Sequence, residues 1–389
     1  MRIAVVTNIL PPEGSGGAEA YAALVAATLA HAHDVLVISG SPTGDIGRAQ
    51  LATVPSLAEL HTDAPLSRKL VWHARDQWRP TVHRATSRAL RTFDPDVVHS
   101  HAVQGLSAAV FTAIAGLGIP HVHTAHDLSL LCARVSMTKN SEFCGGGCAT
   151  CRVQRAIRRR AFGLQPTRLL AVSDYIRRRH VEAGIVPAER AVVLRLGVEG
   201  NGARVRSLSG EGIHVGFIGG LAPHKGVRTL LHTFRDAPET WRLTIAGRGP
   251  LQDEVAAAAA ASPRIAFLGH VSGAQKDAFF DAIDVLAIPS EWEEPAPLVG
   301  FEAAIRAVPC IVSDRGGVGE LAEARVFRAR NSIALREAIE WFLSEPSRLE
   351  SVSRRLFDRR KEFAWDPHLE LLSTILAESA SEGAPDNPP

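Results

Sequence analysis

The sequence predicts an α/β protein with two Rossmann-like domains. Short apolar runs that are typical of buried strands alternate with helical stretches, beginning at Ile3–Thr7 and again at Ile213–Gly219. Between these two series lies a linker at residues 200–212 that is rich in Gly, Ser and Arg. A chain of 389 residues is also long enough for two domains.

In the first domain, the strand Ile3–Thr7 is followed by a glycine-rich loop, a helix and a strand at Asp34–Ser39. The loop lacks the G-x-G-x-x-G pattern of dinucleotide-binding proteins, which argues against a dehydrogenase. Residues 40–65 are expected to form a polar connection rich in loops. Residues 68–92 are expected to form a long basic helical stretch that Pro80 interrupts.

The next two predicted strands carry histidines at alternating positions. His99 and His101 belong to the first of these strands, and His121 and His123 to the second. Such positions are more typical of packed side chains, so we interpret all four as structural. His126 differs because it falls at the carboxyl end of its strand, where open α/β sheets bind ligands. It is therefore a candidate functional residue.

The second domain contains the most informative stretch, residues 287–321. An apolar strand, Val285–Pro289, runs into an acidic turn broken by prolines, and a helix should start near Pro297, because proline suits the first helical turn. Glu294 lies in the turn, and Glu302, eight positions later, should lie about two turns inside the helix. The prolines exclude one continuous helix through both carboxylates. The two carboxylates should therefore have different roles.

The helix start between these carboxylates predicts an anion site. Backbone N–H groups around Leu298 and Val299 are the unpaired donors of a helix start, where donors and the helix dipole together stabilise a phosphate. A carboxylate before this site and another after it suit a ligand with phosphate in the middle and hydroxyls at both ends. A nucleotide sugar has that shape. The alternative interpretation is a solvated acidic loop followed by a glutamate on the surface of a helix.

The E-x7-E spacing, the run E-P-A-P-L-V-G-F-E and the trailing G-G-V-G-E resemble the donor-site signature of retaining glycosyltransferases of family 4, which have the GT-B fold. The resemblance extends over about residues 2–380 and is looser in the first half. It implies two Rossmann-like domains that face each other across a donor/acceptor cleft. We place them at residues 1–203 and 204–365, with a closing helix at 366–380 that packs back on the first domain. Residues 381–389 should form a disordered tail.

The implied reaction moves a sugar, with retention, from a nucleotide-diphosphate sugar to a glycan, lipid-linked or small-molecule acceptor. No metal or other cofactor would be required, and polysaccharide biosynthesis would be a typical setting. By the resemblance, Glu294 contacts hydroxyls of the transferred sugar, Glu302 holds the ribose and Lys225 neutralises the departing diphosphate. The family's usual Arg in the Lys225 element is Gly220 here. Backbone N–H groups or another arginine, such as Arg248, would have to replace it.

The resemblance also assigns roles to residues whose own patterns are weak. The loop at Val271 would form a wall for the base, and the glycine-rich loop of the first domain would meet the donor phosphate and the acceptor. Carried over, these roles are donor binding for Gly16, Gly17, Val271, Leu298 and Val299, acceptor binding for Glu19 and Asp127, and contact with the transferred sugar for His126.

Four of the five cysteines lie within twenty positions, at Cys132, Cys144, Cys148 and Cys151. In a cytosolic protein such a cluster more often binds metal than forms disulfides. Four thiolates would complete a tetrahedral zinc site with a structural role. The spacing C-x11-C-x3-C-x2-C is not that of a standard zinc ribbon, however. The alternative is a set of unligated thiols on a mobile loop near the acceptor.

The charge is unevenly divided between the two halves of the chain. Residues 1–203 hold 22 Lys and Arg against 15 Asp and Glu, whereas residues 204–389 hold 21 against 26. Part of the positive excess lies in a predicted helix that contains Arg155, Arg158 and Arg159. A basic helix can face an anionic membrane or an anionic acceptor, although its usual meaning is a solvated face. We expect no nucleic-acid partner.

No apolar segment approaches the ~20 residues of a membrane span. The first predicted strand begins at Ile3, with no pattern of a signal peptide before it. We therefore expect a cytoplasmic protein, either free or peripheral at the inner face of the membrane. Two rival functions stay open on the same fold. One is another activity such as a nucleotide-sugar epimerase, and the other is a catalytically silent binding protein, which only Gly220 favours.

Overall fold

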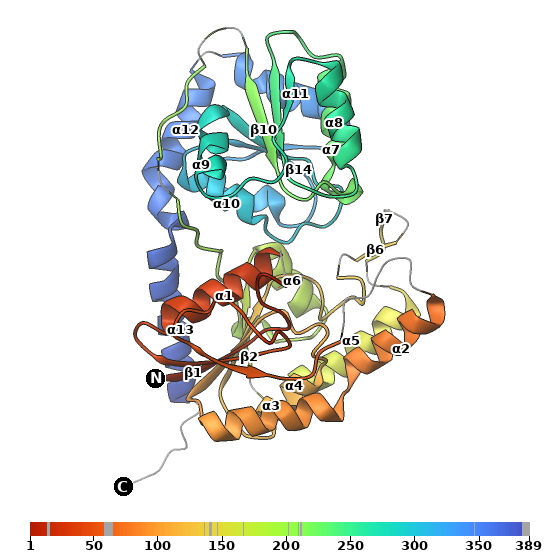
Figure 1. The fold of residues 1–389 in the computed structure, drawn as a ribbon, viewed down its shortest axis with the longest axis vertical. Coiled ribbons are helices and arrows are strands. Elements are labelled where there is room, and N and C mark those ends of the chain that lie inside the picture. The colour runs from red at the N-terminus through yellow and green to blue at the C-terminus, as the bar shows by residue number, and fades with distance from the viewer. Residues whose placement is uncertain are drawn as a thin grey trace. The chain divides into compact units, whose positions relative to one another are not determined.

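The computed structural model describes residues 1–13, 16–57, 65–135, 137–139, 142–145, 147–165, 167–200, 202–208, 210, 212–345 and 347–382. These residues form two compact units, each built on its own sheet. The first unit contains the described residues of 1–137, 144–194 and 369–389, and the second those of 138–143 and 195–368. The predicted α/β class with two Rossmann-like sheets is confirmed (Figure 1).

The first unit has a seven-stranded sheet in which every strand pairs in parallel with its neighbours. The strands inside the sheet are fully or largely buried, as expected for a parallel sheet that is covered on both faces, whereas the strand at each edge includes exposed residues. In spatial order they are β3 (Gln50–Thr53), β2 (Asp34–Ser39), β1 (Arg2–Val6), β4 (Val97–Ser100), β5 (His121–Ala125), β8 (Arg168–Ala171) and β9 (Ala191–Val193).

Strand β3 lies inside the segment 40–65, which the sequence predicted to be loop. Its four residues are only partly buried, so their pattern gives little sign of a strand. The sequence correctly predicts the break at Pro80, which is the first residue of α3. The helices of this unit are α1 (Gly17–Leu29), α2 (Leu66–Gln77), α3 (Pro80–Phe93), α4 (Ala109–Ala115), α5 (Ala149–Phe162) and α6 (Asp174–Glu182).

The second unit has a six-stranded parallel sheet around a core that includes Phe234, Trp241 and Phe342. The strands, in spatial order, are β12 (Ile265–Phe267), β11 (Arg242–Ala246), β10 (His214–Ile218), β13 (Val285–Ile288), β14 (Cys310–Ser313) and β15 (Arg325–Phe327). Helices α7 (Val227–Arg235), α8 (Gln252–Ala261), α9 (Ala274–Ala282), α10 (Leu298–Ile305), α11 (Ser332–Leu343) and α12 (Arg348–Arg359) surround it. A two-stranded pair, β6 (Thr138–Lys139) and β7 (Glu142–Phe143), is assigned to the same unit.

The last helix, α13 (Trp365–Glu382), has its residues from Leu369 onward in the first unit. There Arg168 of β8 forms ion pairs with Glu378 at 2.8 Å and Glu382 at 2.7 Å. The helix is longer than predicted, so Ser381 and Glu382 are helical and do not belong to a disordered tail. The rest of the predicted tail, residues 383–389, lies outside the described residues. No helix that the structure describes is long and apolar enough to cross a membrane.

The order of the strands in each sheet predicts where ligands bind. In the second sheet the chain proceeds from β10 to β11 on one side and later to β13 on the other, so the order reverses between β10 and β13. In the first sheet the same reversal falls between β1 and β4. Ligands of open α/β sheets bind outside the carboxyl ends of the strands at such points. We therefore expect ligands at the loops that follow β10 and β13 and at those that follow β1 and β4.

Arg158 on α5 is buried and does not belong to the basic surface predicted for this helix. Its side chain is 5% exposed, pairs with Asp76 of α2 at 2.5 Å and also donates to the carbonyl of Ser129. Asp76 in turn accepts a hydrogen bond from the backbone N–H of Gly105 at 2.6 Å. Because Arg158 follows the buried Gln154 by one helical turn, it lies on the buried side of the helix. The prediction that Arg158 faces an anionic surface is wrong.

This buried pair gives a stability prediction. Replacing Arg158 with Met leaves the Asp76 carboxylate buried without its partner, which typically costs about 3 kcal/mol or more of unfolding free energy. Urea unfolding of Arg158→Met should show this loss. The control is Arg159→Met on the exposed side of the same helix, which should change the unfolding free energy by about 0.5 kcal/mol or less. Equal stability of the two variants would contradict the structural role of the pair.

Candidate functional site

Glu294 lies in the loop after β13, and three side chains hold its carboxylate. The Nζ of Lys225 lies 2.8 and 3.1 Å from its two oxygens. Ser290 Oγ and Trp292 Nε1 donate to Oε2 at 2.8 and 2.7 Å. Burial by itself would raise the pKa of Glu294, but the charge of Lys225 and these hydrogen bonds hold the pKa below its usual value. The site therefore contains an ionised, buried carboxylate with a cation beside it.

The neighbouring carboxylates of this loop are paired as well. Glu291 accepts a hydrogen bond from Thr229 at 3.0 Å and forms an ion pair with Arg330 at 3.1 Å. Glu293 lies 3.7 Å from Arg315, and its side chain is 10% exposed. The alternative interpretation of the motif as a solvated acidic loop is therefore wrong.

Glycines allow three strand-end loops to interlock around Glu294. Gly226, after β10, has φ +75°, and a Cβ there would lie 1.8 Å from the carbonyl oxygen of Pro289. Gly316, after β14, has φ +66°, and its Cβ would lie 2.3 Å from the carbonyl oxygen of Glu294. The N–H of Gly317 donates to that same carbonyl at 2.7 Å. Both the positive φ angles and the close backbone contacts require glycine.

Glu302 occupies the middle of α10 and pairs with Lys276 of α9 at 2.7 Å. The helix begins at Leu298, with Pro297 as its cap, so the predicted start is confirmed with proline one position earlier than expected. The N–H groups of Leu298 and Val299 head this helix and have no acceptor within it. Glu302 therefore lies about one turn inside the helix and not two as predicted, because the helix begins at Leu298. Anion binding at the helix start stays a prediction.

The missing arginine at Gly220 leaves open space. A Cβ at Gly220 would meet no atom within 4 Å. The loop of Gly220 is joined to the loop after β11, because the N–H of Leu221 donates to the carbonyl of Arg248 at 2.9 Å. The Arg248 side chain is exposed. Val271, in the loop after β12, is 8% exposed. An exposed arginine therefore lies on the loop that is hydrogen-bonded to the loop of Gly220.

In the first unit, His126 directly follows β5 and lies against His101, which directly follows the adjacent strand β4. His101 Nδ1 is 3.1 Å from His126 Nε2, and the two rings stack with centroids 5.4 Å apart. Tyr21 of α1 packs edge-on against both rings, with centroids 5.8 and 5.1 Å away. The interpretation of His101 as purely structural missed this contact, although His101 also falls at the carboxyl end of its strand.

The other three strand histidines, His99, His121 and His123, are buried, and each forms a hydrogen bond inside the sheet. His99 contacts Thr124 at 2.8 Å, and Ser100 bridges His121 and His123 at 2.7 and 2.8 Å. Their burial lowers the pKa of His121 to about 3 and the pKa of His123 well below the usual value. These contacts agree with a structural role for His99, His121 and His123.

The remaining predicted residues of the first unit lie near the ends of strands and helices. Asp127 accepts a hydrogen bond from the N–H of Ser129 at 2.7 Å, and burial raises the pKa of Asp127. Gly16 caps α1 and Gly17 is its first residue, with the half-buried Glu19 in the first turn. No ligand geometry follows from these positions alone.

Of the four clustered cysteines, Cys132, Cys148 and Cys151 make contacts with one another. The sulfurs of Cys132 and Cys151 lie 3.8 Å apart, and Cys148 caps α5, where its sulfur accepts a hydrogen bond from the N–H of Cys151 at 3.4 Å. Burial raises the pKa of Cys151 to about 12, whereas hydrogen bonds with Cys151 lower the pKa of Cys148. Within the described ranges, no three His, Cys, Asp or Glu side chains are grouped to hold a metal ion. The zinc site that would include Cys144 stays a prediction.

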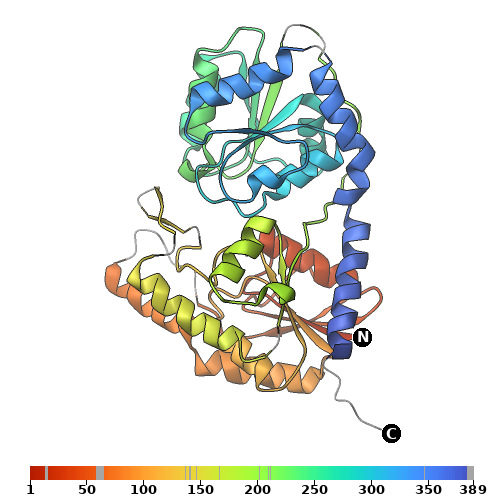
Figure 2. The same ribbon diagram turned by 180° about the vertical axis from the view of Figure 1, so that it is seen from behind.

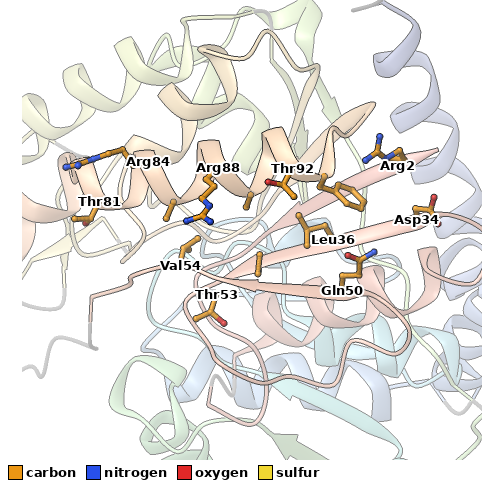
Figure 3. A pocket seen from close by; sticks show the side chains of 14 residues that line it. Arg2, Asp34, Leu36, Gln50, Thr53, Val54, Thr81, Arg84, Arg88 and Thr92 are labelled. Atoms are coloured by element: carbon orange, nitrogen blue, oxygen red, sulfur yellow. The ribbon is translucent and has the colours of Figure 1, made fainter.

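A separate groove of about 940 Å³ lies between helix α3 and the edge of the first sheet (Figure 3). Alternate side chains of β2 and β3, such as Leu36 and Ala52, line one side, and Arg84 and Arg88 of α3 line the other. None of the site residues predicted from the sequence lines this groove. It is therefore distinct from the set of residues that the motifs define.

Comparison with known proteins first gives the class. HepE from Anabaena, solved in complex with UDP, matches with a TM-score of 0.70 at 17% identity, over 97% of this chain and 100% of that one. This match and the two parallel sheets establish the GT-B fold of glycosyltransferases.

Comparison of sequences then gives the family. A profile described as "Glycosyltransferase Family 4" matches residues 15–200, and one described as "Glycosyl transferases group 1" matches residues 212–345. The chain belongs to the family 4 glycosyltransferases, which retain the configuration of the transferred sugar and use nucleotide-sugar donors. The predicted family and enzyme class are confirmed.

Two relatives extend over most of the chain. An uncharacterized 42.6 kDa protein in the cps region of Klebsiella pneumoniae is 23% identical over 333 residues, 82% of this chain and 87% of that protein. A GDP-mannose-dependent alpha-mannosyltransferase of Mycolicibacterium smegmatis is 28% identical over 349 residues, 82% of each chain.

Proposed function

We propose that this enzyme transfers a sugar from a nucleotide-diphosphate sugar to a glycan or lipid-linked acceptor in the synthesis of a cell-surface polysaccharide or glycoconjugate, without a metal ion. The names of the two relatives support this proposal, since one lies in a cps region and the other is a mannosyltransferase. Within the proposal, the second unit binds the donor, and His126, Asp127 and Glu19 of the first unit contact the transferred sugar and the acceptor.

The observation that carries the proposal is the Lys225–Glu294 pair at the carboxyl end of the second sheet. Departure of the nucleoside diphosphate leaves an oxocarbenium-like sugar and places negative charge on the leaving phosphate. Preorganised positive groups stabilise such charge most effectively in a site that excludes water. Lys225 and the start of α10 at Leu298 and Val299 supply positive potential without a metal ion.

Glu294 has two tasks in this account. Its carboxylate accepts hydrogen bonds from hydroxyls of the transferred sugar, and it also fixes the position of Lys225. The ammonium lies 2.8 Å from the carboxylate and 5.1 Å from the centroid of the Trp292 ring, which makes a cation–π contact. Both contacts limit the freedom of a long side chain before the donor binds, so less entropy is lost in the reaction.

Glu302 and Arg248 complete the donor site. Glu302 holds the ribose hydroxyls, and its ion pair with Lys276 at 2.7 Å orients the carboxylate on α10. Arg248 takes over the diphosphate contact that the family's arginine would make from position 220. The room around Gly220 and the hydrogen bond between the two loops support this substitution.

Peripheral membrane contact is proposed for the α2–α5 surface, which we define by the exposed side chains of these two helices. The helices lie side by side in opposite views (Figures 1 and 2). Exposed apolar and basic side chains are mixed on it, an arrangement that favours anionic membrane surfaces. The apolar members are Leu70, Val71, Val153 and Ile157, and the basic ones include Arg68, Arg75, Arg152, Arg159 and Arg160.

The donor site gives a kinetic prediction. Release of nucleoside diphosphate should be measured with candidate donors in the presence of acceptor extracts. Lys225→Ala and Glu294→Gln should each lower kcat about 100-fold, the size found for single electrostatic stabilisers. Because the two side chains act as a unit, the double variant should be little worse than either single one. Glu302→Gln should mainly raise the donor KM, since the ribose is the same in the ground and transition states.

Glu291→Gln is the matched control for these variants, because Glu291 lies in the same loop but pairs with Thr229 and Arg330. It should leave kcat within a few-fold of wild type. A large loss of kcat in Glu302→Gln, with Glu294→Gln affecting only nucleotide binding, would mean that the two carboxylates have exchanged roles. Wild-type protein that binds donor but transfers no sugar would favour the silent binding protein.

The proposed substitution of Arg248 for position 220 can be tested by rescue. Loss of one charged hydrogen-bond donor costs about 1.5 kcal/mol or more, so Arg248→Ala should weaken nucleoside-diphosphate binding about 10-fold. Adding Gly220→Arg to that variant should restore the affinity, since a side chain fits there. Gly220→Gln, similar in length but uncharged, should not. Titration calorimetry with UDP, GDP and ADP measures the effect, and unchanged binding by Arg248→Ala would refute it.

The membrane proposal predicts a salt-dependent loss of binding. A triple variant with Gln in place of Arg152, Arg159 and Arg160 should sediment less with vesicles that contain anionic lipid. The loss should be largest at low salt. The matched control removes the same charge from the second unit, by replacing Arg235, Arg242 and Arg354 with Gln. Equal partitioning of both triple variants would show that the α2–α5 surface is only a solvated face.

A further inference from the structure

The contact between His101 and His126 is a hydrogen bond between two ring nitrogens as well as a packing contact. Parallel pairing of β4 and β5 brings their carboxyl ends to one edge of the sheet, so the residues after each strand meet there. His101 Nδ1 lies at hydrogen-bond distance from His126 Nε2, at 3.1 Å. Tyr21 covers both rings edge-on, which restricts their rotation. One proton must therefore lie between these two nitrogens.

The surroundings of His101 decide which nitrogen donates. Its side chain is 1% exposed, and burial together with the neighbouring histidines holds the pKa of His101 well below its usual value, so the ring is neutral and carries one proton. The Nε2 of His101 is buried and has no hydrogen-bond partner among the described residues. Orphaned buried N–H groups are rarer than orphaned acceptors. The proton therefore belongs on Nδ1, which donates to His126.

We propose that His101 is a positioning residue, whose Nδ1–H donates to Nε2 of His126 and so fixes the tautomer and ring orientation of His126. With Nε2 occupied as an acceptor, a neutral His126 carries its own proton on Nδ1. In that state His126 has no free lone pair with which to take a proton.

This inference rests on the proposed function and narrows it. A retaining transfer needs a group that accepts the proton of the attacking hydroxyl, and His126 would be the obvious imidazole base. The His101 contact removes that option. The proton must therefore go to another acceptor. His126 would then contact the transferred sugar without acting as a base.

The first test is spectroscopic and needs no substrate. Long-range ¹H–¹⁵N spectra of protein labelled at histidine nitrogens report which ring nitrogen carries the proton, and the His126→Asn variant assigns the His126 signals. Wild-type His126 should show protonated Nδ1 and unprotonated Nε2. His101→Asn should keep this pattern, because an asparagine amide nitrogen lies close to the place of Nδ1 and can donate. His101→Leu should lose it.

The kinetic test uses the same variants. His101→Leu should lower kcat about 10-fold or more, the range found when an outer partner that orients a histidine is removed, with the donor KM changed less than about threefold. His101→Asn should recover most of kcat. His121→Asn is the control, because His121 is similarly buried but bonds Ser100 and Thr167 on the other face of the sheet. It should alter stability and leave the His126 tautomer unchanged.

Two results would overturn the proposal. One is a His126 that carries its proton on Nε2 in the wild type, and the other is an unchanged tautomer and kcat in His101→Leu. If His101→Leu does not fold, His101→Gln serves as the test variant instead. The glutamine amide reaches past the position of Nδ1, so this variant should also lose the His126 tautomer and the wild-type kcat. An inactive wild type with the expected spectrum would refute the transfer function and leave the tautomer assignment standing.

Discussion

One buried carboxylate that must stay ionised sets the architecture of the second unit's strand-end loops. Burial of Glu294 opposes its negative charge, and three hydrogen-bond donors, one of them the cation Lys225, reverse that effect. To bring these groups together, the loops after β10, β13 and β14 approach so closely that Gly226 and Gly316 admit no side chain. The catalytic proposal follows from this arrangement, because the same interaction that stabilises the loop holds a cation ready for the leaving group.

The first unit uses a different solution at the corresponding edge of its sheet. Here the strand ends carry histidines, and the contact between His101 and His126 is made by hydrogen bonding and ring packing. The charged contact of this region is the buried ion pair between Arg158 and Asp76, which joins α5 to α2. Arg158 also donates a hydrogen bond to the carbonyl of Ser129, in the segment after His126. Within each unit, therefore, long-range polar contacts fix loops that the sheet alone would leave adjustable.

The sequence predicted the features that depend on local pattern. Apolar runs alternating with helical stretches gave both sheets, and the helix start at Leu298 followed from the prolines before it. The E-x7-E motif identified the family because both of its carboxylates lie on a single loop and helix. Where the pattern was weak, the prediction failed, as for β3, whose partly buried residues resemble a loop.

Contacts between distant segments could not be predicted in the same way. Lys225 and Glu294 are separated by 69 residues, and Arg158 and Asp76 by 82. Periodicity would have placed Arg158 on the buried side of α5, but a charged residue among other arginines suggested a surface. Lys276 gave no signal at all, since nothing in α9 indicates that it meets Glu302 on another helix. The contacts of Ser290 and Trp292 with Glu294 were easier to predict, because both residues lie in the loop of Glu294 itself.

The division of labour between the two carboxylates is the central claim, and donors that lack single sugar hydroxyls test it most directly. Transfer rates with the intact donor and with its monodeoxy analogues should be compared in wild type, Glu294→Gln and Glu302→Gln. If Glu294 binds the transferred sugar, removing the hydroxyl that it contacts should slow the wild type and Glu302→Gln by the same factor, and should hardly slow Glu294→Gln further. If Glu302→Gln is instead the variant that becomes insensitive to every sugar hydroxyl, the account is wrong.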